Sequence, residues 1–285
     1  AGIRPWAWGS LSPDRSQLAL VLGDSEAPNN IYLLNLSNRN FQRLAQSGVE
    51  PVWSPDGTKI AYRSTQTFGL RIVDVATEEF REIFSVDRTN QDYWVNFFTW
   101  SPDSRKIAFI KTVGILEVGE IWVTDADGEG QAVLLVSEEM AAGNITWSPT
   151  EDQILFISEA GEHVTPERPL SLWVVDVGTS GRRQLTQNIS FSGANWSPDG
   201  DWIVLTGVNM LEGISLTYDL WLIAEDGSNL KRLTNDEASD HNPFWISDVS
   251  RVVFRKVGNG IWELNIDTGS FKQLAAQESE YITVR

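Results

Sequence analysis

The stretch "PVWSPDGTKIAYRS" (residues 51–64) joins a tryptophan, a Ser-Pro-Asp-Gly turn and a short apolar run. Nearly the same phrase returns as "FTWSPDSRKIAFIK" (98–111) and "ANWSPDGDWIVLTG" (194–207). Proline fixes its own φ for the first corner of a tight turn, aspartate bonds back to the backbone, and glycine adopts the left-handed conformation that closes the turn. The phrase therefore predicts two strands joined by a turn, in which the aspartate has a structural role.

The phrase recurs at a nearly fixed period. The tryptophans of its copies are separated by 47, 47, 49 and 49 residues, and they are Trp53, Trp100, Trp147, Trp196 and Trp245. A sixth copy, "LSPDRSQLALV" (11–21), carries Leu11 in the tryptophan's place. Because six copies fill the chain, the sequence predicts a single domain over residues 1–285. The predicted repeats cover residues 1–44, 45–84, 85–136, 137–186, 187–234 and 235–275, followed by a tail over 276–285.

A second phrase occurs once per repeat, as in "IYLLNLSNRNFQRL" (31–44) and "LWVVDVGTSGRRQL" (172–185). Its alternating apolar run, turn and second run indicate another hairpin, which makes four antiparallel strands per repeat. A four-stranded sheet cannot bury both of its faces, and six such sheets can cover one another by closing into a ring. The predicted fold class is therefore an all-β, six-bladed β-propeller with four antiparallel strands per blade. The last repeat should complete its own fourth strand at Ser270–Ala275.

The charge composition of the chain limits the kinds of partner that it is expected to bind. The chain has 39 acidic and 22 basic side chains, a net charge of −17, which disfavours nucleic acid and favours a partner with a basic patch. Cysteine is absent, so disulfides and thiolate metal sites are excluded. No apolar run is long enough for a membrane-spanning helix. We expect a monomeric protein without a membrane span.

The phrase "WSPDGTKIAY" (53–62), together with runs such as "IYLLNL" (31–36), resembles the repeat of the TolB-like, WD-related six-bladed propellers. That resemblance implies a non-catalytic module that binds protein or peptide partners. It also implies a bacterial periplasmic or extracellular location, with the cytoplasm as an alternative. The pattern changes at Thr150-Glu151-Asp152 and at Ile246-Ser247-Asp248, where we expect different turn geometry.

The predicted docking face is the end of the blades that carries their long and varied connections, such as "SVDRTNQDYWVN" (85–96) and "GVNMLEGISLTYD" (207–219). Irregular loops on a rigid scaffold are the usual place for binding residues. Candidate partner-binding residues on these loops are Asp87, Asp92, Tyr93, Trp94 and Tyr218. The aromatic residues suit binding hot spots, although they could equally pack over a blade.

Polar residues also precede each repeated tryptophan by three or four positions. We expect them to ring the mouth of the central channel, where they would bind a partner's side chain, a cation or water. They are Glu50, Asn96, Asn144, Ser192, His241 and Asn242. Ordered water that satisfies the strand ends is the alternative.

Catalytic patterns are incomplete. The two histidines, His163 and His241, exclude a three-histidine metal site, and neither HExxH nor GxSxG spacing is present. We therefore predict no enzymatic activity and no cofactor. Two alternatives stay open. One is a glycan- or peptide-processing enzyme whose channel binds a divalent cation such as calcium, and the other is the propeller domain of a longer sensor or peptidase chain.

Overall fold

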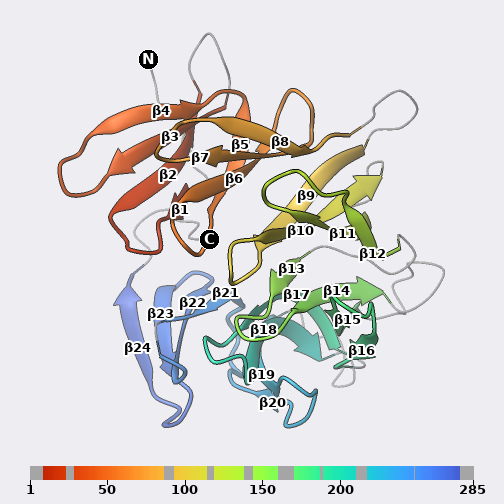
Figure 1. The fold of residues 1–285 in the computed structure, drawn as a ribbon. Coiled ribbons are helices and arrows are strands. Elements are labelled where there is room, and N and C mark those ends of the chain that lie inside the picture. The colour runs from red at the N-terminus through yellow and green to blue at the C-terminus, as the bar shows by residue number, and fades with distance from the viewer. Residues whose placement is uncertain are drawn as a thin grey trace. The chain divides into compact units, whose positions relative to one another are not determined.

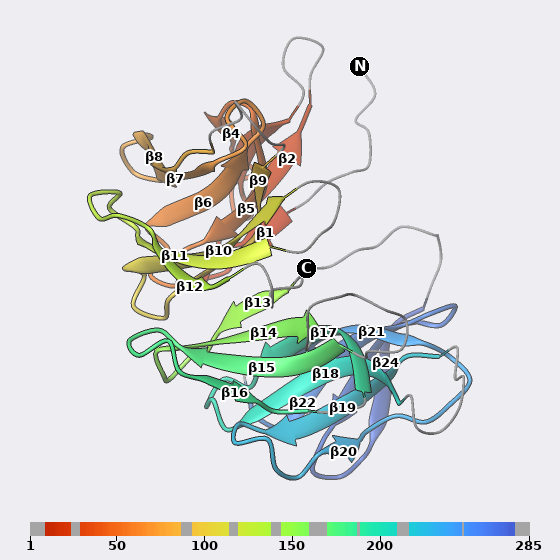
Figure 2. The same cartoon turned by 90° about the vertical axis from the view of Figure 1, so that its right-hand side faces the viewer.

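The computed structural model describes residues 9–23, 29–86, 93–113, 119–137, 144–159, 170–186, 189–209, 217–246 and 248–276. Within these residues the chain forms strands and no helix (Figures 1 and 2). The strands make six antiparallel sheets, each built from four strands that are consecutive in the chain. The sheets are the blades of a six-bladed β-propeller, which confirms the predicted fold class, and we number them 1 to 6 in chain order.

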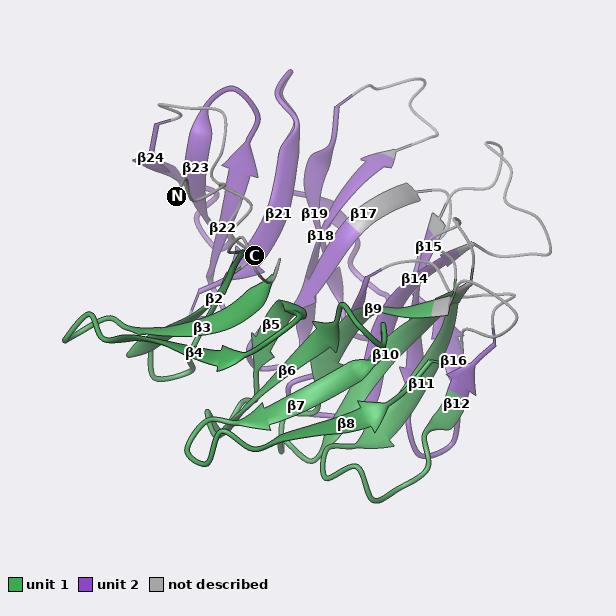
Figure 3. Ribbon diagram, turned by 90° about the horizontal axis from the view of Figure 1, so that it is seen from above, with its two compact units in different colours: residues 1–134, 285 green, residues 135–284 purple. Residues whose placement is uncertain are grey.

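The chain divides into two compact units, residues 1–134 with 285, and residues 135–284 (Figure 3). The first unit holds blades 1 and 2 and most of blade 3. Blade 1 consists of β1 (Gly9–Leu11), β2 (Gln17–Leu22), β3 (Asn30–Asn35) and β4 (Phe41–Ala45). Blade 2 consists of β5 (Gly48–Trp53), β6 (Lys59–Ser64), β7 (Leu70–Asp74) and β8 (Phe80–Phe84). Blade 3 consists of β9 (Tyr93–Trp100), β10 (Lys106–Val113), β11 (Gly119–Asp125) and β12 (Val133–Val136).

The second unit holds blades 4 to 6. Blade 4 consists of β13 (Ile145–Trp147), β14 (Gln153–Glu159), β15 (Leu170–Asp176) and β16 (Arg182–Gln184). Blade 5 consists of β17 (Ile189–Trp196), β18 (Trp202–Asn209), β19 (Asp219–Ala224) and β20 (Lys231–Arg232). Blade 6 consists of β21 (Asp240–Trp245), β22 (Arg251–Lys256), β23 (Gly260–Asn265) and β24 (Phe271–Ala275). β24 pairs with β23, so the last repeat does supply its own fourth strand. The single domain over residues 1–285 stays a prediction.

In blades 1, 2, 3 and 5 the first turn is held by the side chains that the sequence repeats. In blade 2, the Ser54 hydroxyl donates to Asp56 Oδ1 at 2.6 Å, and the same carboxylate accepts the backbone N–H of Thr58 at 2.9 Å. Hydrogen bonds from Ser12 and Ser16 lower the pKa of the corresponding Asp14 to about 2. The serine-to-aspartate bond recurs in blades 1, 3 and 5, between Ser12 and Asp14, Ser101 and Asp103, and Ser197 and Asp199. The aspartates are structural, as the sequence predicts.

The turns of blades 4 and 6 differ, again as predicted. In blade 4, Ser148 Oγ accepts the backbone N–H of Glu151 at 3.2 Å instead of donating to an aspartate. In blade 6, Asp248 accepts a hydrogen bond from Arg251 Nε at 2.6 Å. The turn of blade 5 approaches that of blade 4 so closely that a Cβ on Gly200, whose φ is +82°, would lie 2.2 Å from Thr150 Oγ1. Only glycine fits this position.

Three of the repeated tryptophans form a hydrogen bond to the blade before their own. The indole N–H of Trp53 donates to the carbonyl of Ser10 at 2.9 Å, and that of Trp100 donates to the carbonyl of Val52 at 3.1 Å. In the second unit, Trp245 donates to the carbonyl of Asn195 at 3.2 Å. Each acceptor immediately precedes the tryptophan position of the preceding repeat. The bond therefore links innermost strands in register with the repeat.

Apolar burial accompanies these bonds. Trp100 is buried in a cluster that draws Ile72 from blade 2 and Val95 and Phe109 from blade 3. Trp196 is buried in the equivalent cluster between blades 4 and 5. Truncating a buried tryptophan to alanine costs about 3–5 kcal/mol in protein cores. Trp53, Trp100 and Trp245 thus supply both apolar area and a directional bond between neighbouring blades, whereas Trp196 supplies apolar area.

These two contributions can be separated with Trp100→Phe and Trp196→Phe. Both changes remove similar ring volume from a buried site, but the indole N–H of Trp196 has no hydrogen-bond acceptor within the described part of the chain. Trp100→Phe should therefore lower the free energy of unfolding by about 1 kcal/mol more than Trp196→Phe. Urea unfolding measures the difference. Equal losses would show that the hydrogen bond to Val52 contributes nothing.

Candidate functional site

The innermost strands contain a β-bulge just before the tryptophan. Register shifts occur between Val49 and Val52 in β5, at Phe97 in β9, between Phe191 and Gly193 in β17, and between His241 and Phe244 in β21. Left-handed φ angles mark the same position in four blades, at Glu50, Phe97, Asn144 and Asn242. Bulges re-aim side chains and are enriched beside functional sites. The predicted channel-mouth residues therefore lie at or next to a repeated irregularity of the backbone.

Several of these residues have partners within their own unit. Glu50 pairs with Arg63 of the adjacent strand at 3.1 Å. The side-chain nitrogen of Asn144 lies 3.4 Å from the point that a Cβ on Gly193 would occupy, so it reaches the bulge of the next blade. Asn242 is exposed. Whether these residues line a channel mouth stays a prediction.

Other predicted residues can be placed only in part. Asp87 and Asp92 lie outside the described residues, and for Tyr93 and Ser192 the backbone strand is described without the side chain. Trp94 is partly buried in β9, opposite Thr112 of β10. Their role in partner binding stays a prediction.

The structure brings Tyr218 and His241 together. Their ring centroids are 5.1 Å apart with an interplanar angle of 44°. The contact is fixed by the backbone, because the N–H of Asp240 donates to the carbonyl of Tyr218 at 2.7 Å. A loop residue of blade 5 and an innermost-strand residue of blade 6 thus form one aromatic pair at the loop end of these blades.

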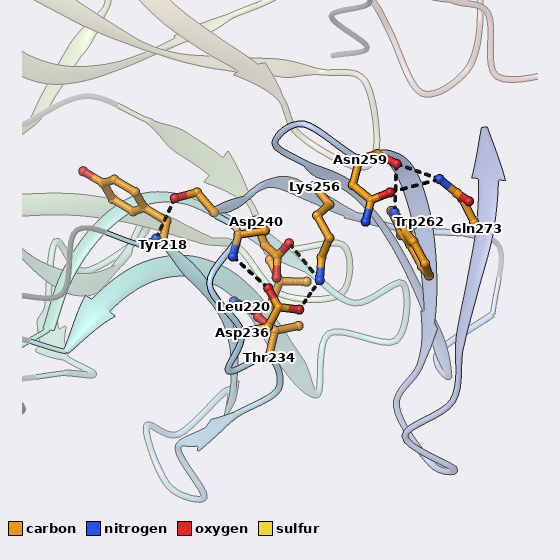
Figure 4. Close-up of polar contacts among 11 residues, drawn as sticks. Tyr218, Leu220, Thr234, Asp236, Asp240, Lys256, Asn259, Trp262 and Gln273 are labelled. Carbon is orange, nitrogen blue, oxygen red and sulfur yellow. Dashed lines mark hydrogen bonds and ion pairs between the residues drawn. The ribbon is translucent and has the colours of Figure 1, made fainter. Parts of the chain in front are cut away.

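Next to His241 in β21 lies a buried carboxylate, that of Asp240. Asp240 is 0% exposed, and neither of its carboxylate oxygens has a hydrogen-bond partner among the described residues. Lys256, directly opposite on β22, places its Nζ 3.9 Å from Asp240 Oδ1 and also pairs with the more exposed Asp236 (Figure 4). A buried carboxylate with one distant counterion is costly to ionise.

The pKa values reflect this environment. Burial raises the pKa of Asp240 to about 6, against the opposing effects of the Thr234 hydroxyl and the Lys256 ammonium. Burial also raises the pKa of Asp219, although Arg232 Nη2 lies 2.6 Å from its carboxylate. Burial, with a smaller contribution from the positive charge of Arg255, lowers the pKa of His241. At neutral pH the site combines an uncharged imidazole with carboxylates whose ionisation depends on their surroundings.

We call Asp219, Thr234, Asp236, Asp240 and Lys256, with Tyr218 and His241, the blade 5/6 cluster. Asp219 and Asp240 are buried, so the groups of the cluster that a partner can reach are the half-exposed carboxylate of Asp236 and the partly exposed rings of Tyr218 and His241. Within the described ranges, no group of three or more histidine, aspartate or glutamate side chains is arranged to hold a metal ion. The accessible part of the cluster suits contact with a partner's ammonium or guanidinium group.

Sequence reasoning identified Tyr218 and His241 but missed the charged residues of the cluster. A signal was present in the repeat. Counting five residues back from each tryptophan aligns Asp240 with Gly48 and Val95, which are both buried. Asp219 occupies the place of the buried Ser171 in blade 4, since each precedes a leucine whose N–H donates to a threonine hydroxyl. A carboxylate at a position that is buried in other repeats marks this site.

Similarity to known sequences identifies the family of this chain. The model of the TolB beta propeller domain matches residues 7–165, which is more than half of the chain. The Tol-Pal system protein TolB of Anaeromyxobacter dehalogenans strain 2CP-C is 35% identical over 126 residues, or 44% of this chain and 26% of that protein. The uncharacterized peptidase YuxL of Bacillus subtilis strain 168 is 25% identical over 180 residues, or 61% of this chain and 24% of that protein. The match thus spans about a quarter of each relative's length.

Solved structures agree on the fold. An oligogalacturonate lyase in complex with manganese superposes with a TM-score of 0.77 at 17% identity, covering 96% of this chain and 78% of that one. The β-propeller domain of the Trilobed protease from Pyrococcus furiosus gives 0.72 at 19% identity, covering 95% and 84%. TolB from Acinetobacter baumannii gives 0.58 at 18% identity, covering 93% and 62%. At these identities the likeness extends to the fold alone.

The buried charge of Asp240 can be tested by pH-dependent unfolding. Because the folded-state pKa is raised, the stabilising contribution of protonated Asp240 is complete below pH 4 and is lost as the pH rises through about 6. Asp240→Asn should therefore gain up to about 2–3 kcal/mol relative to the wild type between pH 4 and pH 8. Urea unfolding at both pH values measures this change.

Asp236→Asn is the matched control. Burial alone would raise the pKa of Asp236, but the hydrogen bonds from Lys256 and from the N–H of Ala238 outweigh it, so the pKa is lowered. Relative to the wild type, this variant should lose stability as the pH rises, which is opposite to the change expected for Asp240→Asn. A pH-independent difference for Asp240→Asn would contradict the assignment of the buried charge.

Proposed function

Because this chain belongs to the TolB beta propeller domain family, we propose that it is a non-catalytic docking module that binds a protein or peptide partner. The observation that carries the proposal is the blade 5/6 cluster, where the partly exposed rings of Tyr218 and His241 contact each other at the loop end of the blades. Tyrosine is among the residues that are enriched in binding hot spots. The family supports the propeller, and the cluster supports the place of docking.

The charge of the chain indicates the chemistry of the partner. With a net charge of −17, the protein attracts basic surfaces and accelerates their association at low salt. Within the cluster, Asp236 is 51% exposed on its side chain and faces solvent beside the shielded Lys256. We infer a partner that presents lysine or arginine side chains to this end. In the other unit, Glu50 and the loop residues Asp87, Asp92, Tyr93 and Trp94 stay separate candidates for contact with such a partner.

The proposal includes a location in the bacterial periplasm or outside the cell. Its support is the family and the absence of cysteine, which makes the fold independent of redox conditions. None of the described residues forms a helix that would be long and apolar enough to cross a bilayer. The protein would act as a monomer and would not bind nucleic acid.

Capture from the cell-envelope fraction of the source bacterium tests the docking face. Immobilised protein should retain a partner that is lost, by at least about tenfold, when Tyr218 and His241 are both changed to alanine. Charge reversal at Glu50, Asp87 and Asp92 should weaken capture and its dependence on salt. Glu79→Lys, a charge reversal in the exposed turn at the other end of blade 2, is the control for each of these reversals made singly. Equal capture by all variants would reject this face.

An enzymatic alternative rests on Asp240, whose pKa of about 6 beside an uncharged His241 suits a general acid or base. In this version the propeller processes a glycan or peptide in its channel, alone or as part of a longer sensor or peptidase chain. Oligogalacturonate lyase and peptidase propellers share the fold.

Calorimetric titration with calcium, manganese and zinc distinguishes the metal-dependent form of this alternative. The docking proposal predicts no heat of binding and no thermal shift with any of the three ions. Saturable binding that Asp240→Asn abolishes would favour the enzyme.

A further inference from the structure

A recess lies among the short turns of blades 5 and 6, at the end of these blades that is opposite the blade 5/6 cluster. It is a cavity of about 520 Å³, within the size range of ligand pockets. It is formed by the start of β18, by β19 and β20, by the end of β21 and by two turns of blade 6. The residues that line it are Trp202, Leu222, Asn229, Leu230, Lys231, Trp245, Val249, Ile266 and Asp267.

Trp202 departs from the repeat. Six residues after the tryptophan position, the other blades carry lysine, glutamine or arginine, at Gln17, Lys59, Lys106, Gln153 and Arg251. Blade 5 has a partly exposed tryptophan there, outside the buried cluster that contains Trp196 and Trp221. The other five blades form without an aromatic residue at this position. Packing of the blade therefore does not account for Trp202, whereas a ligand in the recess would.

The recess has an apolar floor and charged residues at its rim. Leu222 is buried, while Leu230 and Val249 are 39% and 46% exposed. Lys231 and Asp267 are exposed and bring one charge of each sign to the recess. An apolar floor within a polar rim is the arrangement of a pocket that receives an anchoring side chain of a partner.

We propose that this recess binds one large apolar side chain of an extended peptide whose flanking residues are acidic on one side and basic on the other. The apolar side chain would lie between Trp202 and Trp245, and the flanking charges would meet Lys231 and Asp267. A glycan fits less well, because six of the nine lining side chains are apolar and leave few groups to bond its hydroxyls. This inference does not depend on the proposed docking at the loop end, because the two sites are at opposite ends of β21. Asp240 of the blade 5/6 cluster is the first residue of this strand, and Trp245 of the recess is the last, about 17 Å away.

Fluorine NMR of fluorotryptophan-labelled protein tests the site. The probes are Ac-Glu-Phe-Arg-NH2 and Ac-Arg-Phe-Glu-NH2, which present the two orders of charge. The Trp202 resonance, identified by its loss in Trp202→Gln, should shift saturably with one of them, and the matching peptide with glycine in place of phenylalanine should leave it unchanged. Glutamine is a conservative test because blades 1 and 4 already carry it at this position.

In Trp202→Gln, the Trp245 resonance reports binding, and the affinity should fall by at least about tenfold. Asp267→Asn should weaken binding while the protein stays folded, as shown by an unchanged melting temperature. No shift at millimolar peptide, an equal shift with the glycine peptide, or a shift with cellotetraose alone would overturn the proposal. The last result would reassign the recess to a glycan.

Discussion

The hydrogen bond from a tryptophan indole to the innermost strand of the preceding blade is the interaction on which the fold depends. A four-stranded sheet has two faces and too little apolar area to stand by itself. The indole ring supplies that area, and its N–H fixes which carbonyl of the neighbouring strand it meets. The acceptors Ser10, Val52 and Asn195 hold the same position in their repeats, so one phrase in the sequence sets the register between successive blades.

The sites that we propose lie where individual repeats depart from this common plan. Most blades use the serine, the turn and the tryptophan to hold their structure, so these positions leave little freedom for binding. Asp240 lies at a position where the other blades have small or apolar residues. Trp202 lies at a position where the other blades have polar residues. The two departures fall in adjacent blades and at opposite ends of them. A repeat protein therefore offers an internal reference against which a binding residue stands out, even without related sequences.

The sequence allowed the fold to be predicted because its signals are local and repeated. Turn residues, alternating strands and a period of 47 to 49 residues led to four-stranded blades, and the structure contains them. The site was harder to predict because it depends on contacts between elements far apart in the chain. The pairing of Tyr218 with His241 follows from a backbone bond between blades, and the burial of Asp240 follows from packing. Alignment of the repeats contains a trace of both proposed sites. A charged residue, Asp240, replaces buried residues such as Val95, and an aromatic residue, Trp202, replaces partly exposed polar ones.

Hydrogen exchange of the indole protons tests the central claim most directly. In a protein with assigned tryptophan resonances, the indole protons of Trp53, Trp100 and Trp245 should exchange as slowly as the most protected backbone amides, because they are released only when neighbouring blades separate. The partly exposed Trp202 provides the reference for rapid exchange within the same molecule. Exchange of the three indole protons as fast as that of Trp202 would show that these bonds do not hold the blades together.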